Sequence, residues 1–393
     1  MLLRNGRIVL ADHVLERGWV QVDAARITAL GPDDPPTCAD IIDLDGSWVL
    51  PGFVDMHVHG GGGGSYLVAD PAQARHARDF HRAHGTTTTV ASLVTAAPQT
   101  LAAQLESLVD LVVDGTLAGV HLEGPFLSGA RCGAHDPALL RDPDVALMDE
   151  LIAAARGTIR MVTFAPELAN SDALVELLVA AGVVAAVGHT DASYEAAMRA
   201  FDAGAAVATH LFNGMRGIDH RQPGPVVAAV NSPHVVVELI NDGVHLHPAM
   251  VAATMGLVSA RRVAFVSDAI SAAGRPDGDY DIGSMKVRVR GNVATLAGGT
   301  SLAGSTLTLD EALRRGVEEV GLLIGDVSRA LSGTPARVLG IDDVVGSLTA
   351  GKDADIVVLD ERLSLTRVLS KGSWVDRSTV LGRPAMDDIG VLS

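Results

Sequence analysis

Lysine is scarce in this 393-residue sequence, because it occurs only at Lys286, Lys352 and Lys371. The absence of lysine before residue 286 excludes a lysine nucleophile, and a lysine-derived bridge between two metal ions, from that whole region. Histidine has the reverse distribution, since all 14 histidines lie between His13 and His247. The sequence therefore predicts that the chemistry lies in the middle of the chain and that the C-terminal third is structural.

Cysteine, positive charge and long apolar runs are also in short supply. Cys38 and Cys132 are far apart in sequence, which argues against a disulfide scaffold and predicts two free thiols. The formal net charge of −17, with no basic tract, would repel nucleic acid and anionic membranes. The sequence has no apolar run long enough for a membrane span and no signal-type segment at its start. We expect a cytoplasmic protein without nucleic-acid or membrane partners, in which any anionic substrate must meet a local arginine.

The spacing of the apolar residues predicts an α/β protein. Residues 1–50 alternate like short antiparallel strands, with a hairpin turn at 23–26. Residues 51–273 alternate between apolar strands and helices rich in alanine, leucine and glutamate, a pattern typical of a (β/α)8 TIM-like barrel. We expect barrel strands at 50–57, 86–93, 117–122, 159–164, 183–188, 205–210, 235–240 and 262–267, and helices at 71–84, 98–112, 144–156, 171–181 and 192–203.

The remainder of the chain is expected to complete the barrel and a small β-sandwich domain built from both chain ends. Strand-like alternation returns at 285–290, 354–359 and 366–369, and these pieces are predicted to join the N-terminal strands in the sandwich. Within this plan, residues 274–306 supply β-strands and a loop that returns to the active site, residues 307–340 supply helices that pack on the barrel, and residues 341–393 supply the C-terminal part of the sandwich.

His57 and His59 end the first predicted barrel strand. Alternate residues of a strand point to the same face, so the two side chains can bind one metal ion. The five glycines at 60–64 follow directly and leave no side chains in the way. Two ordinary histidines at a strand end are an equally good interpretation of this pair alone.

Further polar residues follow the ends of other predicted barrel strands: Glu123, His189, His210 and Asp268. The carboxyl ends of all eight strands of a barrel meet at one rim, so these side chains are expected to converge with His57 and His59. Imidazole and carboxylate ligands suit a borderline divalent ion such as zinc, which lowers the pKa of a water ligand towards 7. A nearby carboxylate such as Asp268 can then act as general base, which indicates hydrolysis at carbon.

The sequence resembles the amidohydrolase superfamily and, within it, the N-acetylglucosamine-6-phosphate deacetylases over most of its length. The motifs that carry the resemblance are His-Leu-Glu-Gly-Pro-Phe at 121–126, Gly-His-Thr at 188–190, His-Leu-Phe-Asn-Gly-Met at 210–215, Asp-Gly-Val-His at 242–245 and Ser-Asp-Ala at 267–269. The resemblance implies hydrolysis of the acetamide of N-acetylglucosamine 6-phosphate to glucosamine 6-phosphate and acetate, in amino-sugar catabolism and cell-wall recycling.

The resemblance also implies a role for each site residue. Glu123, His189 and His210 would bind the principal metal, and Asp268 would be the catalytic acid and base. Arg221 lies where these deacetylases place a phosphate-binding arginine, which can reach a neighbouring subunit, and a homodimer is expected. As an isolated loop arginine, Arg221 is equally well interpreted as a solvated surface charge. Substrate contacts are implied for His135 and His245, and for the segments at Ala134, Asn213, Gly214, Leu302, Ala303 and Gly304.

Several alternatives stay open at this point. Because His57 and His59 are present, one or two metal ions per subunit are possible, and zinc, iron, manganese and cobalt all suit the ligands. An amidohydrolase acting on a cyclic amide or nucleobase would use the same ligands without needing Arg221. A phosphotriesterase-like activity is disfavoured because no lysine bridge is available, and a metal-binding scaffold without catalysis is disfavoured by Asp268. Cys132 lies in a small, flexible loop, where we interpret it as incidental rather than as a substrate contact.

Overall fold

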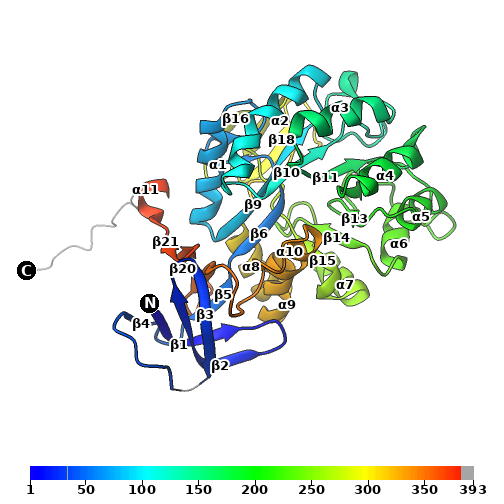
Figure 1. The fold of residues 1–393 in the computed structure, drawn as a ribbon. Coiled ribbons are helices and arrows are strands. Elements are labelled where there is room, and N and C mark those ends of the chain that lie inside the picture. The colour runs from blue at the N-terminus through cyan, green and yellow to red at the C-terminus, as the bar shows by residue number, and fades with distance from the viewer. Residues whose placement is uncertain (33, 382–393) are drawn as a thin grey trace, which may run out of the picture.

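The computed structural model of the protein describes residues 1–32 and 34–381. A small β-domain and a larger barrel lie side by side, and the chain enters the barrel from the small domain (Figure 1). No helix among the described residues combines the length and the apolar character needed to cross a membrane.

The barrel consists of eight parallel strands in sequential order, as predicted. These strands are β6 (Phe53–Val58), β9 (Thr86–Val94), β10 (Gly119–Glu123), β11 (Ile159–Phe164), β12 (Val184–Val187), β13 (Val207–Ala208), β14 (Val236–Leu239) and β15 (Val263–Phe265). Backbone hydrogen bonds bring the first and last strands together, because Asp268 N–H donates to the His57 carbonyl at 2.9 Å and His59 N–H donates to the Ala269 carbonyl at 2.8 Å. The predicted (β/α)8 fold is confirmed.

Seven helices follow the barrel strands and cover the outside of the sheet (Figure 1). They are α1 (Pro71–Ala83), α2 (Pro98–Val113), α3 (Val145–Ala155), α4 (Ser171–Ala180), α5 (Tyr194–Asp202), α6 (Gly224–Asn231) and α7 (Pro248–Val258). Short polar side chains begin several of them. Asp70, Asp144 and Ser193 each accept a backbone N–H of the first helical turn, which fixes where α1, α3 and α5 begin. The five helices predicted from the sequence are confirmed.

The small domain is one continuous sheet whose strands come from both ends of the chain. Its strands are β1 (Leu2–Val9), β2 (Val14–Asp23), β3 (Arg26–Pro32), β4 (Ile41–Asp43), β5 (Trp48–Pro51), β19 (Ile356–Leu359), β20 (Leu365–Ser370) and β21 (Ser373–Trp374). β19 pairs with β5 in antiparallel register, so a C-terminal strand lies beside the strand that leads into the barrel. The domain has its own hydrophobic core, which includes Val20, Val49 and Ile356. Residues 382–393 of the predicted C-terminal unit lie outside the described residues.

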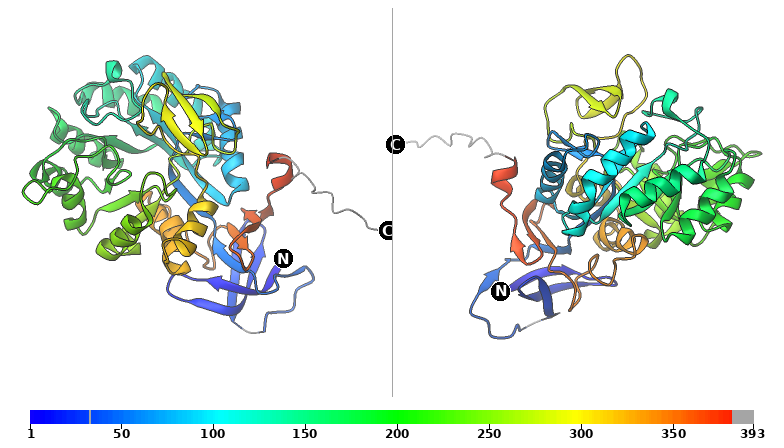
Figure 2. Two further views of the ribbon diagram at one scale, coloured as in Figure 1. Left: turned by 180° about the vertical axis from the view of Figure 1, so that it is seen from behind. Right: turned by 45° about the horizontal axis from the view of Figure 1, so that its top comes forward.

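One predicted strand exists but pairs with other strands than expected. Residues 285–290 do not join the small domain; they form β17 (Met285–Arg290) of a separate sheet with β16 (Gly278–Ile282) and β18 (Val293–Leu296). The alternation of buried Val287 and Val289 reports a half-buried strand but carries no information about its partner. Here the nearest strands in sequence supply the partners through short turns. This sheet lies at the end of the barrel away from the small domain (Figure 2).

The region predicted to be helical at 307–340 contacts β6 and β15 through its π-helical turn and its last helix, near the amino ends of these strands. It contains α8 (Leu309–Glu318), α9 (Ile324–Ser328), a π-helical turn (Arg329–Gly333) and α10 (Thr334–Val338). Short helical turns lie at Pro137–Leu139 and Ala260–Arg262, a two-residue hairpin pairs β7 (Gly60–Gly61) with β8 (Gly64–Ser65), and α11 (Arg377–Leu381) ends the described chain.

Candidate metal centre

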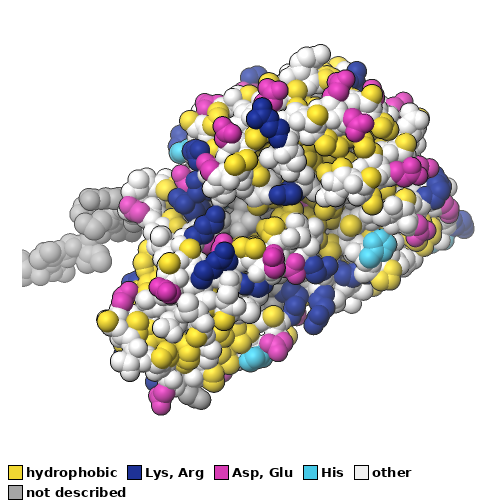
Figure 3. Space-filling model, viewed as in Figure 1, with side chains coloured by type: hydrophobic (Ala, Val, Ile, Leu, Met, Phe, Trp, Pro, Cys, Tyr) yellow, Lys and Arg dark blue, Asp and Glu magenta, His cyan; other side chains and the backbone are white. Residues whose placement is uncertain are grey.

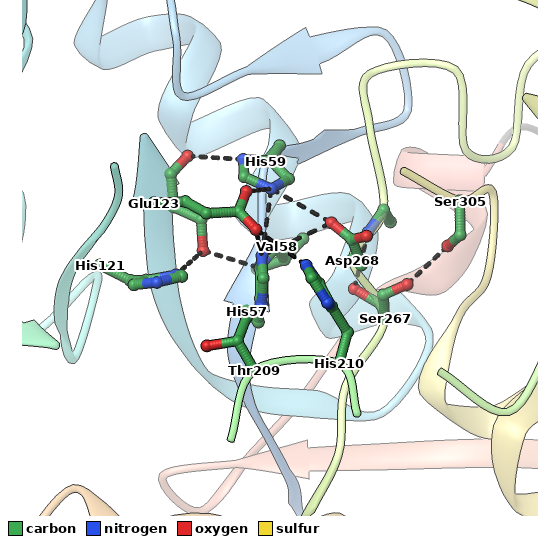
Figure 4. A network of polar contacts seen from close by, with 12 residues as sticks. His57, Val58, His59, His121, Glu123, Thr209, His210, Ser267, Asp268 and Ser305 are labelled. Carbon is green, nitrogen blue, oxygen red and sulfur yellow. Dashed lines mark hydrogen bonds and ion pairs between the residues drawn. The ribbon is translucent and has the colours of Figure 1, made fainter. Parts of the chain in front are cut away.

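The barrel brings six polar residues that were singled out in the sequence to one place. His57 lies in β6 with His59 just beyond its end, and Glu123 is the last residue of β10. His189, His210 and Asp268 follow β12, β13 and β15 by two or three residues. Figure 4 shows the side chains from β6, β10 and the segments after β13 and β15 pointing towards one another. All six residues are buried.

The facing atoms lie close enough to share a metal ion. Glu123 Oε1 is 3.1 Å from His189 Nε2 and 3.0 Å from His210 Nε2. The other carboxylate oxygen of Glu123 is 3.3 Å from His59 Nε2, and the Nε2 atoms of His57 and His59 are 3.3 Å apart. Two groups of possible ligands result, one with His57 and His59 and one with His189 and His210, and Glu123 belongs to both.

A hydrogen bond made by Nδ1 orients each of the four histidine rings of the cluster. His57 Nδ1 donates to Glu238 Oε2 at 3.0 Å, and the Nδ1 atoms of His59, His189 and His210 donate to backbone carbonyls at 2.8–3.1 Å. With Nδ1 donating, each ring in its neutral form turns the lone pair of Nε2 towards Glu123. Four such lone pairs and a carboxylate facing one another repel unless a cation, either a metal ion or a proton on a ring, lies between them. The donor set thus fits a divalent metal, and the Nδ1 contacts are the supports that metal-bound histidines usually have.

Negative charge dominates this centre. Burial alone would lower the pKa of His59, but contacts with Asp268 and Glu123 raise it to about 9. Burial likewise opposes ionisation of Asp268, yet the adjacent His57 and His59 hold the pKa of that carboxyl well below its usual range. Asp268 is therefore ionised at neutral pH and able to accept a proton, and the site as a whole favours a bound cation.

The backbone at these strand ends is strained. His189, His210 and Asp268 have positive φ angles of 45°, 27° and 49°. Residues other than glycine enter this region at a cost of about 1–3 kcal/mol each, and such strain clusters at functional sites. Gly214 has a φ of 60°, and a Cβ there would lie 2.8 Å from His189 Nδ1. A side chain at this position would displace His189 from the cluster.

A pocket of about 280 Å³ opens beside the cluster. Its walls contain most of the predicted substrate contacts: Ala134, His135, Asn213, Gly214, His245, Leu302 and Gly304. Ala303 is buried behind the wall, and Arg221 lies exposed on a loop and does not line the pocket. Ile282 of β16 also lines the pocket, so the separate three-stranded sheet closes one side of it.

The pKa values of two pocket histidines are shifted in opposite directions. Thr95 N–H donates to His135 Nδ1 at 3.3 Å, which leaves the proton of the neutral ring on Nε2, 3.4 Å from Glu123. Burial lowers the pKa of His135 to about 4, so the ring is a neutral donor near pH 7. His245 Nδ1 instead donates to Asp242 at 2.7 Å, and although burial opposes protonation, Asp242 raises the pKa of His245.

Sequence reasoning missed the residues that support the cluster from behind. Glu238 of β14 is fully buried; its Oε2 accepts from His57 Nδ1 and, at 3.1 Å, from the backbone N–H of His210. Ser92 Oγ and Thr163 Oγ1 contact the two ring nitrogens of His121 at 3.0 and 2.8 Å. The one available signal was a charged residue, Glu238, inside an otherwise apolar predicted strand.

Comparisons with known proteins agree with this geometry. The profile of the Amidohydrolase family matches residues 48–383, and the chain belongs to that family, whose members are metal-dependent. More particularly, the chain is similar to an N-acetylgalactosamine-6-phosphate deacetylase of Escherichia coli O157:H7 (34% identity; 94% of this chain and 98% of the relative). It is also similar to an N-acetylglucosamine-6-phosphate deacetylase of Bacillus subtilis (33% identity; 95% and 96%).

Solved structures extend the similarity to three dimensions. A mutant of the N-acetyl-D-glucosamine-6-phosphate deacetylase of Mycobacterium smegmatis, in complex with N-acetyl-D-glucosamine-6-phosphate, has 44% sequence identity and a TM-score of 0.93. The match covers 95% of this chain and 99% of that one. The Thermotoga maritima N-acetylglucosamine-6-phosphate deacetylase has 30% identity and a TM-score of 0.85 over 95% of this chain and 99% of that chain.

Proposed function

We propose that this protein removes the acetyl group of N-acetylglucosamine 6-phosphate, giving glucosamine 6-phosphate and acetate, in amino-sugar catabolism and cell-wall recycling. The proposal rests on one observation: Glu123, His189 and His210 lie together with the ionised Asp268 in the wall of one pocket. Similarity to deacetylases along nearly the whole chain supports the choice of a linear acetamide over a cyclic amide or a nucleobase.

The principal metal would be held by Glu123, His189 and His210, and a second ion by His57 and His59 with Glu123 shared. Zinc is the favoured ion because imidazole and carboxylate ligands suit it, although iron, manganese and cobalt accept the same donors. A divalent metal bound there would polarise the acetamide carbonyl and lower the pKa of a water molecule.

The residues of the chain would carry the proton and stabilise the developing charge. Asp268, ionised at neutral pH, accepts a proton from the attacking water and delivers it to the departing amine nitrogen. His135, with its proton on Nε2, donates a hydrogen bond to the carbonyl oxygen as that oxygen becomes negative. His245 also lines the pocket and would contact the sugar.

The phosphate requires a cation from outside the pocket, because no lysine or arginine is found among the described residues that line it. Arg221 is exposed on the loop before α6, so its side chain is available to a second subunit. We therefore propose a homodimer in which Arg221 of one subunit binds the phosphate in the site of the other, since a guanidinium can donate two parallel hydrogen bonds to a phosphate. A cytoplasmic location fits a substrate of this kind.

The direct test is acetate release from N-acetylglucosamine 6-phosphate and from unphosphorylated N-acetylglucosamine, on protein whose metal content has been measured. We expect a strong preference for the phosphorylated sugar. Equal rates on both would contradict the role of the phosphate, and no acetate from either would contradict the deacetylase proposal. N-acetylgalactosamine 6-phosphate belongs in the same assay as a second candidate, because one relative with 34% identity is named for it.

A further inference from the structure

A second cavity, larger than the pocket beside the metal cluster, lies away from the proposed active site. It has a volume of about 580 Å³, within the usual range for small-molecule sites. It is bordered by the end of β1, by Pro51 just before β6, by the π-helical turn and α10, and by the segment 342–352. Pro51 precedes the first barrel strand, whereas His57 and His59 end it, so this cavity lies at the amino ends of the barrel strands.

Positive charge is concentrated around this cavity. Its wall contains five cationic residues and one acidic residue, Asp342; the cations are Arg261, Arg262, Arg329, Arg337 and Lys352. The whole sequence has 30 lysines and arginines against 47 acidic residues, so such a cluster runs against the average charge of the protein. Lysine and arginine side chains gather where the small domain meets the barrel (Figure 3).

None of these five cations forms an ion pair with the residues that the structure describes. Arg262 donates to four backbone carbonyls, and Lys352 Nζ donates to Ser347 Oγ at 2.7 Å, to the Val345 carbonyl at 3.1 Å and to the Asp342 carbonyl. These two cations therefore supply positive charge to the wall rather than free donors. Arg337 Nη2 donates to the Arg261 carbonyl, and Arg329 donates to the Ala11 carbonyl. The Arg261 side chain makes no hydrogen bond within the described chain, so several N–H donors are left for a ligand.

The backbone of the wall is unusual as well. Arg329 and Gly333, both in the wall, begin and end the π-helical turn. Turns of this kind are rare and occur frequently at functional sites. Gly325, Gly333 and Gly346 carry no side chain, and the hydroxyl residues Ser259, Ser328 and Ser347 add small polar groups to the wall. The cavity thus combines space, polar groups and an excess of positive over negative charge in its wall.

We propose that this cavity is a second binding site, which takes a small phosphorylated metabolite. Arginines from separate segments of the chain suit a ligand with more than one anionic group, because each guanidinium can donate two parallel hydrogen bonds to a phosphate. The proposal does not depend on the proposed deacetylase activity, since the residues and the end of the barrel differ. Ser332 Oγ, in the π-helical turn, lies 3.5 Å from the Pro51 carbonyl, so a ligand bound here lies next to the start of the strand that carries His57 and His59.

The test is calorimetric titration of the metal-loaded enzyme with inorganic phosphate and with a hexose bisphosphate. The variants are Arg261→Gln and Arg337→Gln. The Arg261 side chain makes no hydrogen bond or ion pair with the described residues, so its replacement removes no polar contact within that part of the chain. Arg199→Gln on α5 is the matched control, an arginine outside the cavity. We expect each cavity variant to raise the dissociation constant about tenfold or more, because a hydrogen bond between charged groups is lost. Arg199→Gln should bind both probes as the unchanged protein does.

A deacetylation assay and a thermal midpoint without ligand establish that the variants are folded, and we expect Arg261→Gln to match the unchanged protein in both. No binding of either probe to the unchanged protein would overturn the proposal. Equal affinity in the unchanged protein and in Arg261→Gln would also overturn it, because the anion would then be bound elsewhere, such as in the deacetylase pocket.

Discussion

At the scale of single residues, the role of Asp268 is the most direct to test. Asp268→Asn keeps the shape of the side chain but removes the base that accepts the water proton. We expect kcat to fall by about 10²–10⁴-fold, the usual contribution of a positioned acid or base. Metal content should stay the same, since the two possible ligand groups do not include Asp268. Near-normal turnover in this variant would remove Asp268 from the mechanism.

Glu238 gives a second prediction at this scale, because it holds a candidate ligand without facing the pocket. Glu238→Gln replaces the charged acceptor of His57 Nδ1 with an amide. We expect metal affinity to fall by about 10–100-fold, as is typical when the partner of a metal-bound histidine is lost. Metal content after dialysis against a graded chelator measures this directly.

The control for Glu238→Gln is Asp355→Asn, which alters a buried carboxylate in the small domain. This variant should retain its metal even if its stability changes. Equal metal loss in the two variants would show that the effect is a general weakening of the fold and would contradict the specific role of Glu238.

The sequence could indicate residues that face the site but not those behind them. His57, Glu123 and Asp268 stand out because they are polar and lie at or just beyond the ends of apolar strands. Glu238 lies within such a strand, and its meaning appears only when β14 is placed near β6 in the closed barrel. The direction in which Arg221 points could not be deduced either, because an exposed loop arginine has no periodic pattern to orient it.

At the scale of elements, the spacing of apolar residues was sufficient to predict the helices and strands of the barrel. β11 was predicted with the bounds that it has because it is a buried apolar run between turns. The predicted start of α1 at residue 71 is also correct, and Asp70 and Pro71 mark that start in the structure. The strand at 285–290 was recognised but assigned to the wrong sheet. Alternation identifies a strand with one buried face, whereas pairing depends on which neighbours lie within reach.

The glycine run after β6 yields a prediction at this scale. A Cβ at Gly61 would lie 2.5 Å from both His81 Nε2 and Phe80 Cδ1 of α1. Gly61→Ala should therefore push α1 away from the β7 and β8 hairpin and cost about 1–3 kcal/mol of stability, as overpacking of a close contact usually does. The thermal midpoint of the metal-loaded protein should fall by several degrees. Gly129→Ala is the control, because nothing lies within 4 Å of a Cβ there, and equal midpoints for both variants would contradict the steric argument.

At the scale of the whole molecule, charge and topology work together. The division of the chain at residues 50, 273, 306 and 340 stays a prediction, but the barrel does collect the six polar residues at one end and leaves the cationic cavity at the other. Because the protein has a net charge of −17, its overall electrostatic field repels an anionic sugar, and a specific cation must bind the phosphate.

Assembly should supply that cation, and mixing two defective subunits tests it. Arg221→Ala lacks the proposed phosphate contact but has a complete catalytic set, whereas Asp268→Asn has the reverse defect. In a mixed dimer, the site with an intact Asp268 would receive Arg221 from the other subunit. Random pairing makes half of the dimers mixed with one complete site each, so co-expression should restore about one quarter of the normal activity at low substrate concentration.

The outcome depends on which subunit supplies the arginine. If Arg221 instead served its own subunit, no mixed dimer would contain a complete site, and the co-expressed protein would be no more active than the average of the two variants alone. That result, or a protein that sediments as a monomer while hydrolysing the phosphorylated sugar efficiently, would contradict a shared site. Recovery of activity would in turn explain why the pocket of a single chain has no lysine or arginine among the described residues of its wall.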